Sequence, residues 1–324
     1  MTKPKIAGSA RIIGQVRLGS KAYIAQGSIL RSVEDSITLG NGTWVLENSV
    51  LIGTPEQKLS VGSKTIFGHR CVAIGAEIGS LCEIGNSTIF LPGSKVGNWC
   101  IFGEGTIVPA GQVIPSESVV VGRPGRVIRR LTSQDRERIA SLRGNDTSLG
   151  TPVEHISKSE GKEGDGMQNL YEYNGKFPSV SASTVVFPSA EITGDVVIGE
   201  NCVIGAGVKI IGDSHGPVRI GNNVHILENT VLHLLPDNEL NIHDNVTIGP
   251  CCMIHGTTIG ANSVIEAGAI VCDYSTLGKN TLVKAGSLVK QRSVFPDNQI
   301  LEGFPAKSSG ELTELQPRPV WAFR

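Results

Sequence analysis

Aliphatic residues recur at every sixth position over most of the chain. A period of two predicts a flat strand and a period of 3.6 a helix. A period of six with one inward-facing aliphatic residue indicates a short strand followed by a turn, and three such units form a triangular coil. Stacked coils then pair their strands in parallel. The series reads Ile12, Leu18, Ile24 and Leu30 near the start and Ile198, Ile204 and Ile210 in the second half.

Gly and Asn lie beside many of the expected turns, where the backbone needs a positive φ. The pattern resembles that of the hexapeptide-repeat family, whose fold is a left-handed parallel β-helix. We therefore predict an all-β protein. It contains two left-handed parallel β-helix domains in tandem, with a short α-helix after the first.

The hexad pattern occurs in two blocks. They predict an N-terminal β-helix over residues 6–126 and a C-terminal β-helix over residues 178–307. The segment between them, residues 127–177, is expected to hold a helix followed by a flexible linker. The helix is predicted over 133–143, because Thr132 or the residue after it can cap its first turn. The linker is predicted because its Ser, Gly, Lys, Glu and Asp residues cannot bury enough apolar surface.

The tail, residues 308–324, contains two prolines that argue against a long helix. Its aromatic side chains Trp321 and Phe323 are expected to dock on a neighbouring surface.

The two halves are duplicates, because equivalent residues lie 181 positions apart. The segment VLENSVL at 45–51 matches ILENTVL at 226–232. Both halves also carry a P-(E/D)-x-x-L sequence, at Pro55–Leu59 and at Pro236–Leu240. We expect an extended turn to interrupt each β-helix there.

Composition excludes several functions. The 29 basic and 30 acidic residues nearly cancel, so no nucleic-acid partner is expected. No apolar run approaches the roughly 18 residues that span a bilayer, and the N-terminus shows no apolar signal segment, so no membrane partner is expected. Seven cysteines without CxxC spacing favour reduced thiols and a cytoplasmic location.

Three of the seven histidines lie in one window, Val231–Gly256. It contains the segments VLH, ending at His233, and MIHG, with His255. A catalytic zinc site uses three protein ligands and a water, and imidazole nitrogen is a preferred ligand. The order of these segments resembles that in γ-class carbonic anhydrases. In that family zinc ligands come from VLH, TIGH and LHG segments, and the middle histidine comes from a neighbouring subunit of a trimer. The resemblance assigns His233 and His255 as ligands, whereas Pro250 replaces the middle one.

The first half has the complementary losses. The segment IFGH places His69 at the middle-ligand position, while Ile52 and Ile74 replace the other two histidines. The resemblance thus implies a composite zinc site in which His69 of an N-terminal half meets His233 and His255 of a C-terminal half. The pairing could occur within one chain or in a homo-oligomer. As an alternative, a thiolate of Cys251 or Cys252 replaces the lost imidazole in a ring of C-terminal halves.

A second complementary pair is implied by the family's LRGD segment. The first half keeps Arg31 in LRSV and the second keeps Asp213 in IIGD, so an interface ion pair between them is expected. The remaining histidines, such as His225 and His243, are expected at the surface.

The pocket departs from the family. Leu46 and Leu227 replace a Gln that orients the zinc-bound water. The neighbouring acids, Glu47 and Glu228, are retained and are candidate proton shuttles.

We therefore expect a zinc-dependent lyase that acts on a small molecule by activating water, with CO2 hydration itself weakened. The first alternative is a non-catalytic β-helical scaffold, like the γ-type subunits of dynactin and mitochondrial complex I. The second is a hexapeptide acyltransferase.

Overall fold

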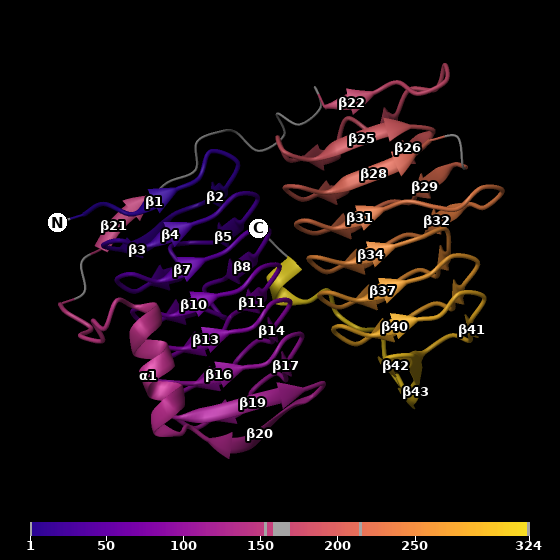
Figure 1. Cartoon of the computed structure of the whole chain (residues 1–324). Helices are drawn as coiled ribbons and strands as arrows, with labels where there is room; N and C mark the ends of the chain where they lie inside the picture. Colours follow the sequence, from indigo (N-terminus) through magenta and orange to yellow (C-terminus); the bar gives the residue numbers. More distant parts are fainter. Residues whose placement is uncertain (1, 152–153, 158–168, 214–215, 323–324) are drawn as a thin grey trace. The chain divides into compact units, whose positions relative to one another are not determined.

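The structure is a computed structural model. It describes residues 2–151, 154–157, 169–213 and 216–322. The chain divides into two compact units, Met1–Glu160 and Gly161–Ala322, and each is a left-handed parallel β-helix (Figure 1). The predicted fold class is confirmed. No helix in the described residues is long and apolar enough to cross a membrane.

The first unit has three sheets, here named N1, N2 and N3, and each coil contributes one strand to each sheet. N1 contains β1 (Lys5–Ile6), β4 (Tyr23–Ile24), β7 (Trp44–Val45), β10 (Ile66–Phe67), β13 (Glu83–Ile84), β16 (Ile101–Phe102), β19 (Ser118–Gly122) and β20 (Gly125–Arg130). N2 contains β2 (Arg11–Ile13), β5 (Ile29–Ser32), β8 (Val50–Gly53), β11 (Val72–Ile74), β14 (Ile89–Phe90) and β17 (Ile107–Val108). N3 contains β3 (Val16–Gly19), β6 (Ile37–Leu39), β9 (Leu59–Val61), β12 (Glu77–Ile78), β15 (Lys95–Val96), β18 (Val113–Ile114) and β21 (Glu154–Ser157).

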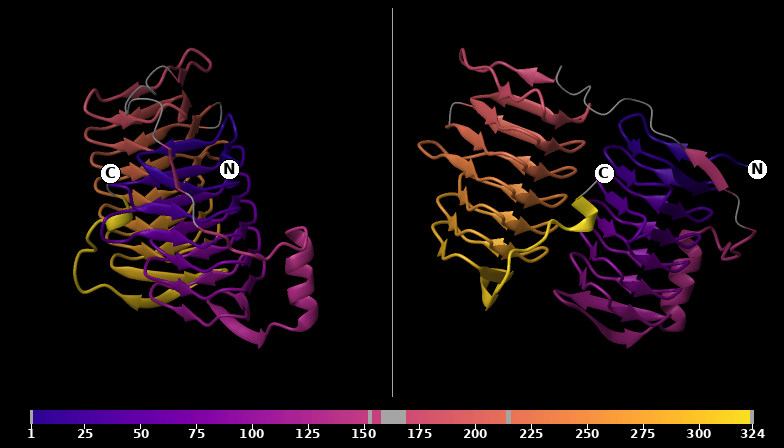
Figure 2. Two further views of the ribbon diagram at one scale, coloured as in Figure 1. Left: turned by 90° about the vertical axis from the view of Figure 1, so that its left-hand side faces the viewer. Right: turned by 180° about the vertical axis from the view of Figure 1, so that it is seen from behind.

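The second unit repeats this plan in sheets C1, C2 and C3 (Figure 2). C1 contains β24 (Val185–Val186), β27 (Val203–Ile204), β30 (His225–Ile226), β33 (Thr247–Ile248), β36 (Val264–Ile265), β39 (Leu282–Val283), β42 (Gln299–Gly303) and β43 (Ala306–Glu311). C2 contains β22 (Leu170–Tyr171), β25 (Glu191–Gly194), β28 (Lys209–Gly212), β31 (Val231–Leu232), β34 (Met253–Ile254), β37 (Ile270–Val271) and β40 (Leu288–Val289). C3 contains β23 (Ser179–Val180), β26 (Val196–Ile198), β29 (Val218–Ile220), β32 (Leu240–Ile242), β35 (Thr258–Ile259), β38 (Thr276–Leu277) and β41 (Val294–Phe295).

The hexad residues form columns inside each prism, because strands pair in parallel with equivalent positions in register. Ile66 of β10, for example, pairs with Trp44 of β7, and Phe67 with Val45. The turns between strands are tight. Asn48 and Asn229 occupy the same turn in the two units, with φ of 58° and 56°, values that Asn tolerates better than most residues.

Antiparallel hairpins end both β-helices. In the first unit β19 pairs with β20, and in the second β42 pairs with β43. Two Gly-x-Pro sequences that lie 181 positions apart, at residues 122–124 and 303–305, form these two hairpin turns.

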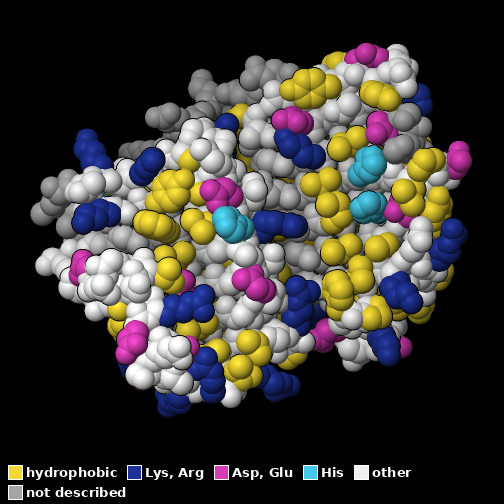
Figure 3. Space-filling model, in the orientation of Figure 1, with side chains coloured by type: hydrophobic (Ala, Val, Ile, Leu, Met, Phe, Trp, Pro, Cys, Tyr) yellow, Lys and Arg dark blue, Asp and Glu magenta, His cyan; other side chains and the backbone are white. Residues whose placement is uncertain are grey.

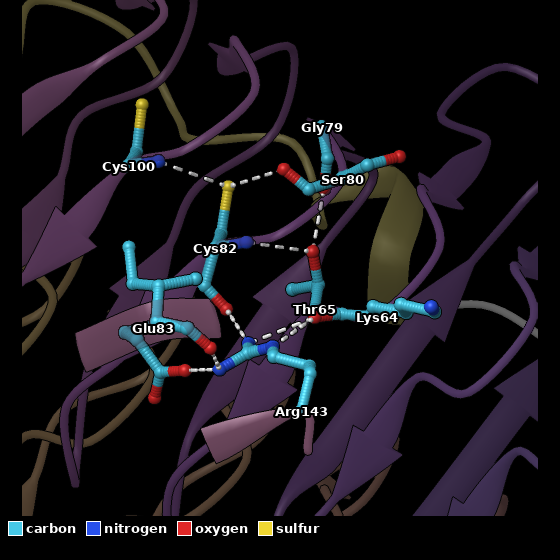
Figure 4. A network of polar contacts seen from close by, with 9 residues as sticks. Lys64, Thr65, Gly79, Ser80, Cys82, Glu83, Cys100 and Arg143 are labelled. Atoms are coloured by element: carbon cyan, nitrogen blue, oxygen red, sulfur yellow. Dashed lines mark hydrogen bonds and ion pairs between the residues drawn. The ribbon is translucent and has the colours of Figure 1, made fainter. Parts of the chain in front are cut away.

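Helix α1 (Ser133–Leu142) covers part of sheet N1. Thr132 caps it, and its side chain and that of Asp135 form a reciprocal capping box. At the end of the helix the guanidinium of Arg143 donates to the carbonyl of Lys64 at 2.8 Å and that of Cys82 at 3.2 Å, and pairs with Glu83 (Figure 4). Burial lowers the pKa of Arg143 to about 10, so it stays charged at neutral pH.

In the second unit the tail covers the equivalent sheet, C1. The guanidinium of Arg318 donates to Thr247 Oγ1 at 3.2 Å and to His225 Nε2 at 2.9 Å. Because Nε2 accepts this bond, Nδ1 carries the proton and donates to the carbonyl of Ala322 at 2.9 Å. The expected surface position of His225 is therefore wrong: the side chain is buried, because the tail folds back over it.

The tail ends in a short 3-10 helix, Val320–Ala322, in which Trp321 is buried. Phe323, the other aromatic residue expected to dock, lies outside the described residues.

Part of the expected linker is ordered as strands. Residues 154–157 form β21, which pairs antiparallel with β3 at the edge of N3. Residues 170–171 form β22, which pairs with β25 and so extends C2 towards the N-terminus. Backbone pairing to an open sheet edge requires no hydrophobic pattern, so composition alone did not indicate these strands. Residues 158–168 of the linker lie outside the described residues.

Phe90 is the centre of an aromatic stack in the core of the first unit. Its ring centroid lies 6.3 Å from that of Phe67 and 5.0 Å from that of Phe102. We expect Phe90→Ala to lower the free energy of unfolding by about 3–5 kcal/mol, because the surrounding side chains relax only partly into the cavity that the substitution leaves. Urea denaturation followed by circular dichroism measures the change. Val113→Ala, at a side chain that is 67% exposed, is the control and should cost less than about 0.5 kcal/mol. Equal losses would contradict the assignment of Phe90 to the core.

We expect Arg143→Leu to loosen helix α1, because it leaves two carbonyls and Glu83 without their cation, at a cost of about 2–3 kcal/mol. Hydrogen exchange of the α1 amides should accelerate. The emission of Trp99 should also change, because Arg136 of the helix lies 5.3 Å from its ring centroid. The exposed Arg138→Leu on the same helix is the matched control and should change neither signal.

Candidate metal site

Four polar side chains form a column along one corner of the second unit. Asp213, His233 and His255 directly follow β28, β31 and β34 of sheet C2, Asp273 lies two residues after β37, and these four strands are consecutive neighbours in that sheet. The strand register places His233 beside His255, because Val231 pairs with Met253 and Leu232 with Ile254, whereas Asp213 and Asp273 reach the histidines from turn positions outside that register. Figure 3 shows histidine side chains beside one another, surrounded mainly by hydrophobic ones.

His233 and His255 lie next to each other. Their ring centroids are 6.2 Å apart, and the rings meet edge to face at 79°. Both side chains are partly exposed, so a ligand from solvent can reach them. Each ring also has a carboxylate beside one nitrogen: Asp213 Oδ2 lies 3.5 Å from His233 Nε2, and Asp273 Oδ2 lies 3.0 Å from His255 Nδ1.

This donor set fits zinc. Two imidazoles on adjacent coils supply nitrogen ligands, and a carboxylate beside the second ring nitrogen is the usual outer partner of a metal-binding histidine. The set is incomplete within the described residues, where no group of three or more His, Cys, Asp and Glu side chains could hold a metal ion. A metal bound to these two histidines would need a third ligand from outside this column.

His69 occupies the corner after β10 in sheet N1. Its Nδ1 lies 2.8 Å from Glu47 Oε2, which follows β7 one coil earlier. The carboxylate engages Nδ1, so Nε2 remains available as a metal ligand. Glu47 and His69 are both exposed enough to meet another surface.

The equivalent corner of the second unit has lost its imidazole. Pro250 follows β33 where His69 follows β10, and Glu228 occupies the position of Glu47. Pro250 and Glu228 are both buried. Leu227, one residue before Glu228, is also buried, whereas its counterpart Leu46 is partly exposed.

The two isoleucines of the first unit that replace ligands are strand residues. Ile52 lies in β8 and Ile74 in β11, paired with each other in sheet N2, and both are fully buried. They occupy the positions of His233 and His255, so the first unit has an apolar pair where the second has the imidazole pair.

Of the expected interface pair, Asp213 lies beside His233, and Arg31 is buried in β5 of the other unit. The structure thus shows a contact between Asp213 and the candidate ligand His233, and the sequence did not indicate this contact.

Cys252, one of the two cysteines after Pro250, is a poor candidate for the missing ligand. Cys252 is buried, and its thiol faces the carbonyl of Glu266 at 3.2 Å. Burial raises the pKa of Cys252 to about 12, which disfavours the thiolate that zinc binds.

Asp273 is the member of the column that sequence reasoning missed. One signal was present, since an acidic residue followed a hexad strand next to the histidine segments. Only the contacts of Asp273 with His255 and with the backbone of Leu235 show that this acid belongs to the site.

Comparisons with known proteins show the family to which this chain belongs. Two hexapeptide-repeat models match the second unit, "Bacterial transferase hexapeptide (six repeats)" over residues 240–273 and "Hexapeptide repeat of succinyl-transferase" over residues 195–233. Gamma carbonic anhydrase 1 of Arabidopsis thaliana mitochondria is 34% identical over 151 residues, which cover 44% of this chain and 54% of that protein. A carbonic anhydrase of Geobacillus kaustophilus is 41% identical over 155 residues, which cover 48% of this chain and 85% of that protein. The chain belongs to the γ-carbonic anhydrase-like family of hexapeptide-repeat proteins.

The bacterial carbonic anhydrase matches about half of this γ-carbonic anhydrase-like chain, in keeping with two β-helical units in tandem. Among solved structures, a hexapeptide transferase family protein from Anaplasma phagocytophilum is 33% identical, with a TM-score of 0.43, and the match covers 46% of this chain and 87% of that one.

Proposed function

We propose that this chain is a γ-carbonic anhydrase-like zinc protein with lyase-type chemistry. His233 and His255 of a C-terminal unit and His69 of an N-terminal unit bind the ion. The observation that carries the proposal is the pair of adjacent imidazoles, each with a carboxylate at one ring nitrogen. His69 completes the set because it has the same arrangement with Glu47 and stands where the second unit has Pro250.

When bound, zinc would lower the pKa of a coordinated water to roughly 7 and so supply hydroxide. Glu47 orients His69 through Nδ1, and its partial exposure allows it to pass a proton to solvent. Glu228 and Leu227 follow sheet C1, at the corner of Pro250 and not at that of His233 and His255. Glu47 is therefore the acid of the composite site, and Leu46 beside it excludes water and gives an apolar wall. Arg31 and Asp213 pair between the units that form the site.

We expect weak CO2 hydration for the same reason. A Gln at position 46 would hold the attacking hydroxide by a hydrogen bond, whereas Leu46 provides no donor or acceptor. We infer a substrate larger and less polar than CO2.

Zinc content tests the ligand set. We expect purified protein to bind zinc, and His69→Ala, His233→Ala and His255→Ala each to lose at least about tenfold in zinc affinity, since each removes one of three ligands. Metal analysis after dialysis against a weak chelator measures the content. The exposed His243→Ala serves as the matched control and should retain zinc. If His69→Ala keeps its zinc while His233→Ala loses it, the composite site is wrong and the metal belongs to the second unit alone.

Stopped-flow CO2 hydration tests the pocket. We expect little activity from the zinc-loaded protein, and a rise of roughly tenfold in Leu46→Gln, because the introduced amide can orient the nucleophile. Val294→Gln, at an exposed position of β41, controls for added polarity. High activity in the unmodified protein would refute the role given to Leu46.

Acyl transfer is a second candidate, favoured by the transferase descriptions of the two repeat models that match residues 195–233 and 240–273. It would use a histidine as base and requires no metal. A non-catalytic scaffold is the remaining alternative. A purified protein that contains no zinc and lacks hydratase activity would favour acyl transfer or a scaffold role. Turnover of an acyl-CoA substrate would then indicate acyl transfer, and its absence a scaffold.

A further inference from the structure

Asp273 is a buried carboxylate that faces both ligand-bearing segments of the second unit. The residue is 5% exposed. One oxygen, Oδ1, accepts hydrogen bonds from the backbone N–H of Leu235 at 2.9 Å and of Gly256 at 3.1 Å. The side-chain amide of Asn238 donates to the same oxygen at 3.3 Å. These donors compensate for the cost of burying the charge.

The second oxygen, Oδ2, faces His255. It lies 3.0 Å from Nδ1. That nitrogen is buried and has no aligned hydrogen bond within the described residues, so the carboxylate is the polar group that the structure brings to it. A carboxylate beside one imidazole nitrogen favours the tautomer that carries its proton there. The proton on Nδ1 leaves the lone pair on Nε2.

The same carboxylate holds the chain that leaves His233. Leu235 lies two residues after His233, at the start of the extended turn. Asn238 of that turn also donates to the carbonyl of Gly256 at 2.7 Å. The side chain of Asp273 therefore connects the segment after His233 to the segment after His255. Leu235 and Asp273 lie 38 positions apart in the sequence.

The duplicate shows that the extended turn does not require this carboxylate. In the first unit Pro92 stands at the equivalent position, and the turn closes locally, because Thr54 and Gln57 exchange two backbone hydrogen bonds. The unit without the carboxylate is also the unit with Ile52 and Ile74 in place of the histidines. The acid and the imidazoles are thus present together or absent together.

We propose that Asp273 is the positioning residue of the metal site: it sets the tautomer of His255 and fixes the spacing between His255 and His233. The proposal rests on the zinc site proposed above. Its effect on the tautomer exists without metal, so the two ideas can be tested separately.

The test uses Asp273→Asn in the full chain. Asparagine keeps an oxygen for Leu235 and Gly256 but removes the charge beside His255. Zinc affinity, measured by competition with a chelator, should fall by roughly 10–100-fold, the loss typical of such outer partners. Asp297→Asn is the matched control, since Asp297 also accepts a backbone N–H, that of Lys279, away from the histidines. Its affinity should be unchanged.

Nitrogen-15 NMR of the histidine side chains in metal-free protein gives the second readout. At a pH where His255 is neutral, the unmodified protein should show the proton on Nδ1, and Asp273→Asn should show a mixture of tautomers. Unchanged tautomer and unchanged zinc affinity in Asp273→Asn would overturn the proposal. Absence of zinc binding in the unmodified protein, with the tautomer change present, would refute the zinc function and leave the positioning role intact.

Asn238→Ala separates positioning from folding. It removes a donor to Asp273 and leaves the carboxylate beside His255 in place. We expect it to lose less zinc affinity than Asp273→Asn and to keep the His255 tautomer. An equal loss in both variants would show that Asp273 acts only through the turn, against the proposal.

Discussion

Parallel, in-register stacking is the interaction on which this structure depends. Successive coils lie about 4.8 Å apart, and each residue pairs with its equivalent in the next coil. Residues at equivalent positions of successive coils therefore lie in columns. Aliphatic residues produce the continuous core, and Asn or Gly in the left-handed turns allows the chain to bend between strands. The same geometry places His233 beside His255, although 22 positions separate them in the printed sequence.

Duplication allowed the two units to diverge without loss of the fold. The prism needs inward aliphatic residues and tight turns, and both units keep them. Corner positions are free of that requirement. One unit carries His69 with Glu47 and the other carries His233 and His255 with their carboxylates. The covers of the first sheet also diverged: a capped helix held by Arg143 covers N1, and an extended tail held by Arg318 covers C1.

Two largely buried charged groups beside the prisms are held by specific partners. The guanidinium of Arg143 meets carbonyls that the β-helix leaves at its corners, and Asp273 meets the N–H groups of the extended turn. Burial makes these contacts demanding, since a buried charge without a partner costs several kcal/mol. Such residues therefore position their neighbours closely. In the second unit this constraint acts on the two imidazoles.

The sequence by itself determined the β-helical class, the two units, the helix after the first and the pairing of His233 with His255. These features follow from a period, and a period is preserved when coils stack. Only the tertiary structure decided the rest: the pairing of β21 with β3, the burial of His225 under the tail, and the contact of Asp273 with Leu235 and His255. Such contacts join segments that lie outside the repeat or in irregular turns. Their positions depend on which donors and acceptors remain unpaired once the coils have stacked, and no local pattern in the sequence records that.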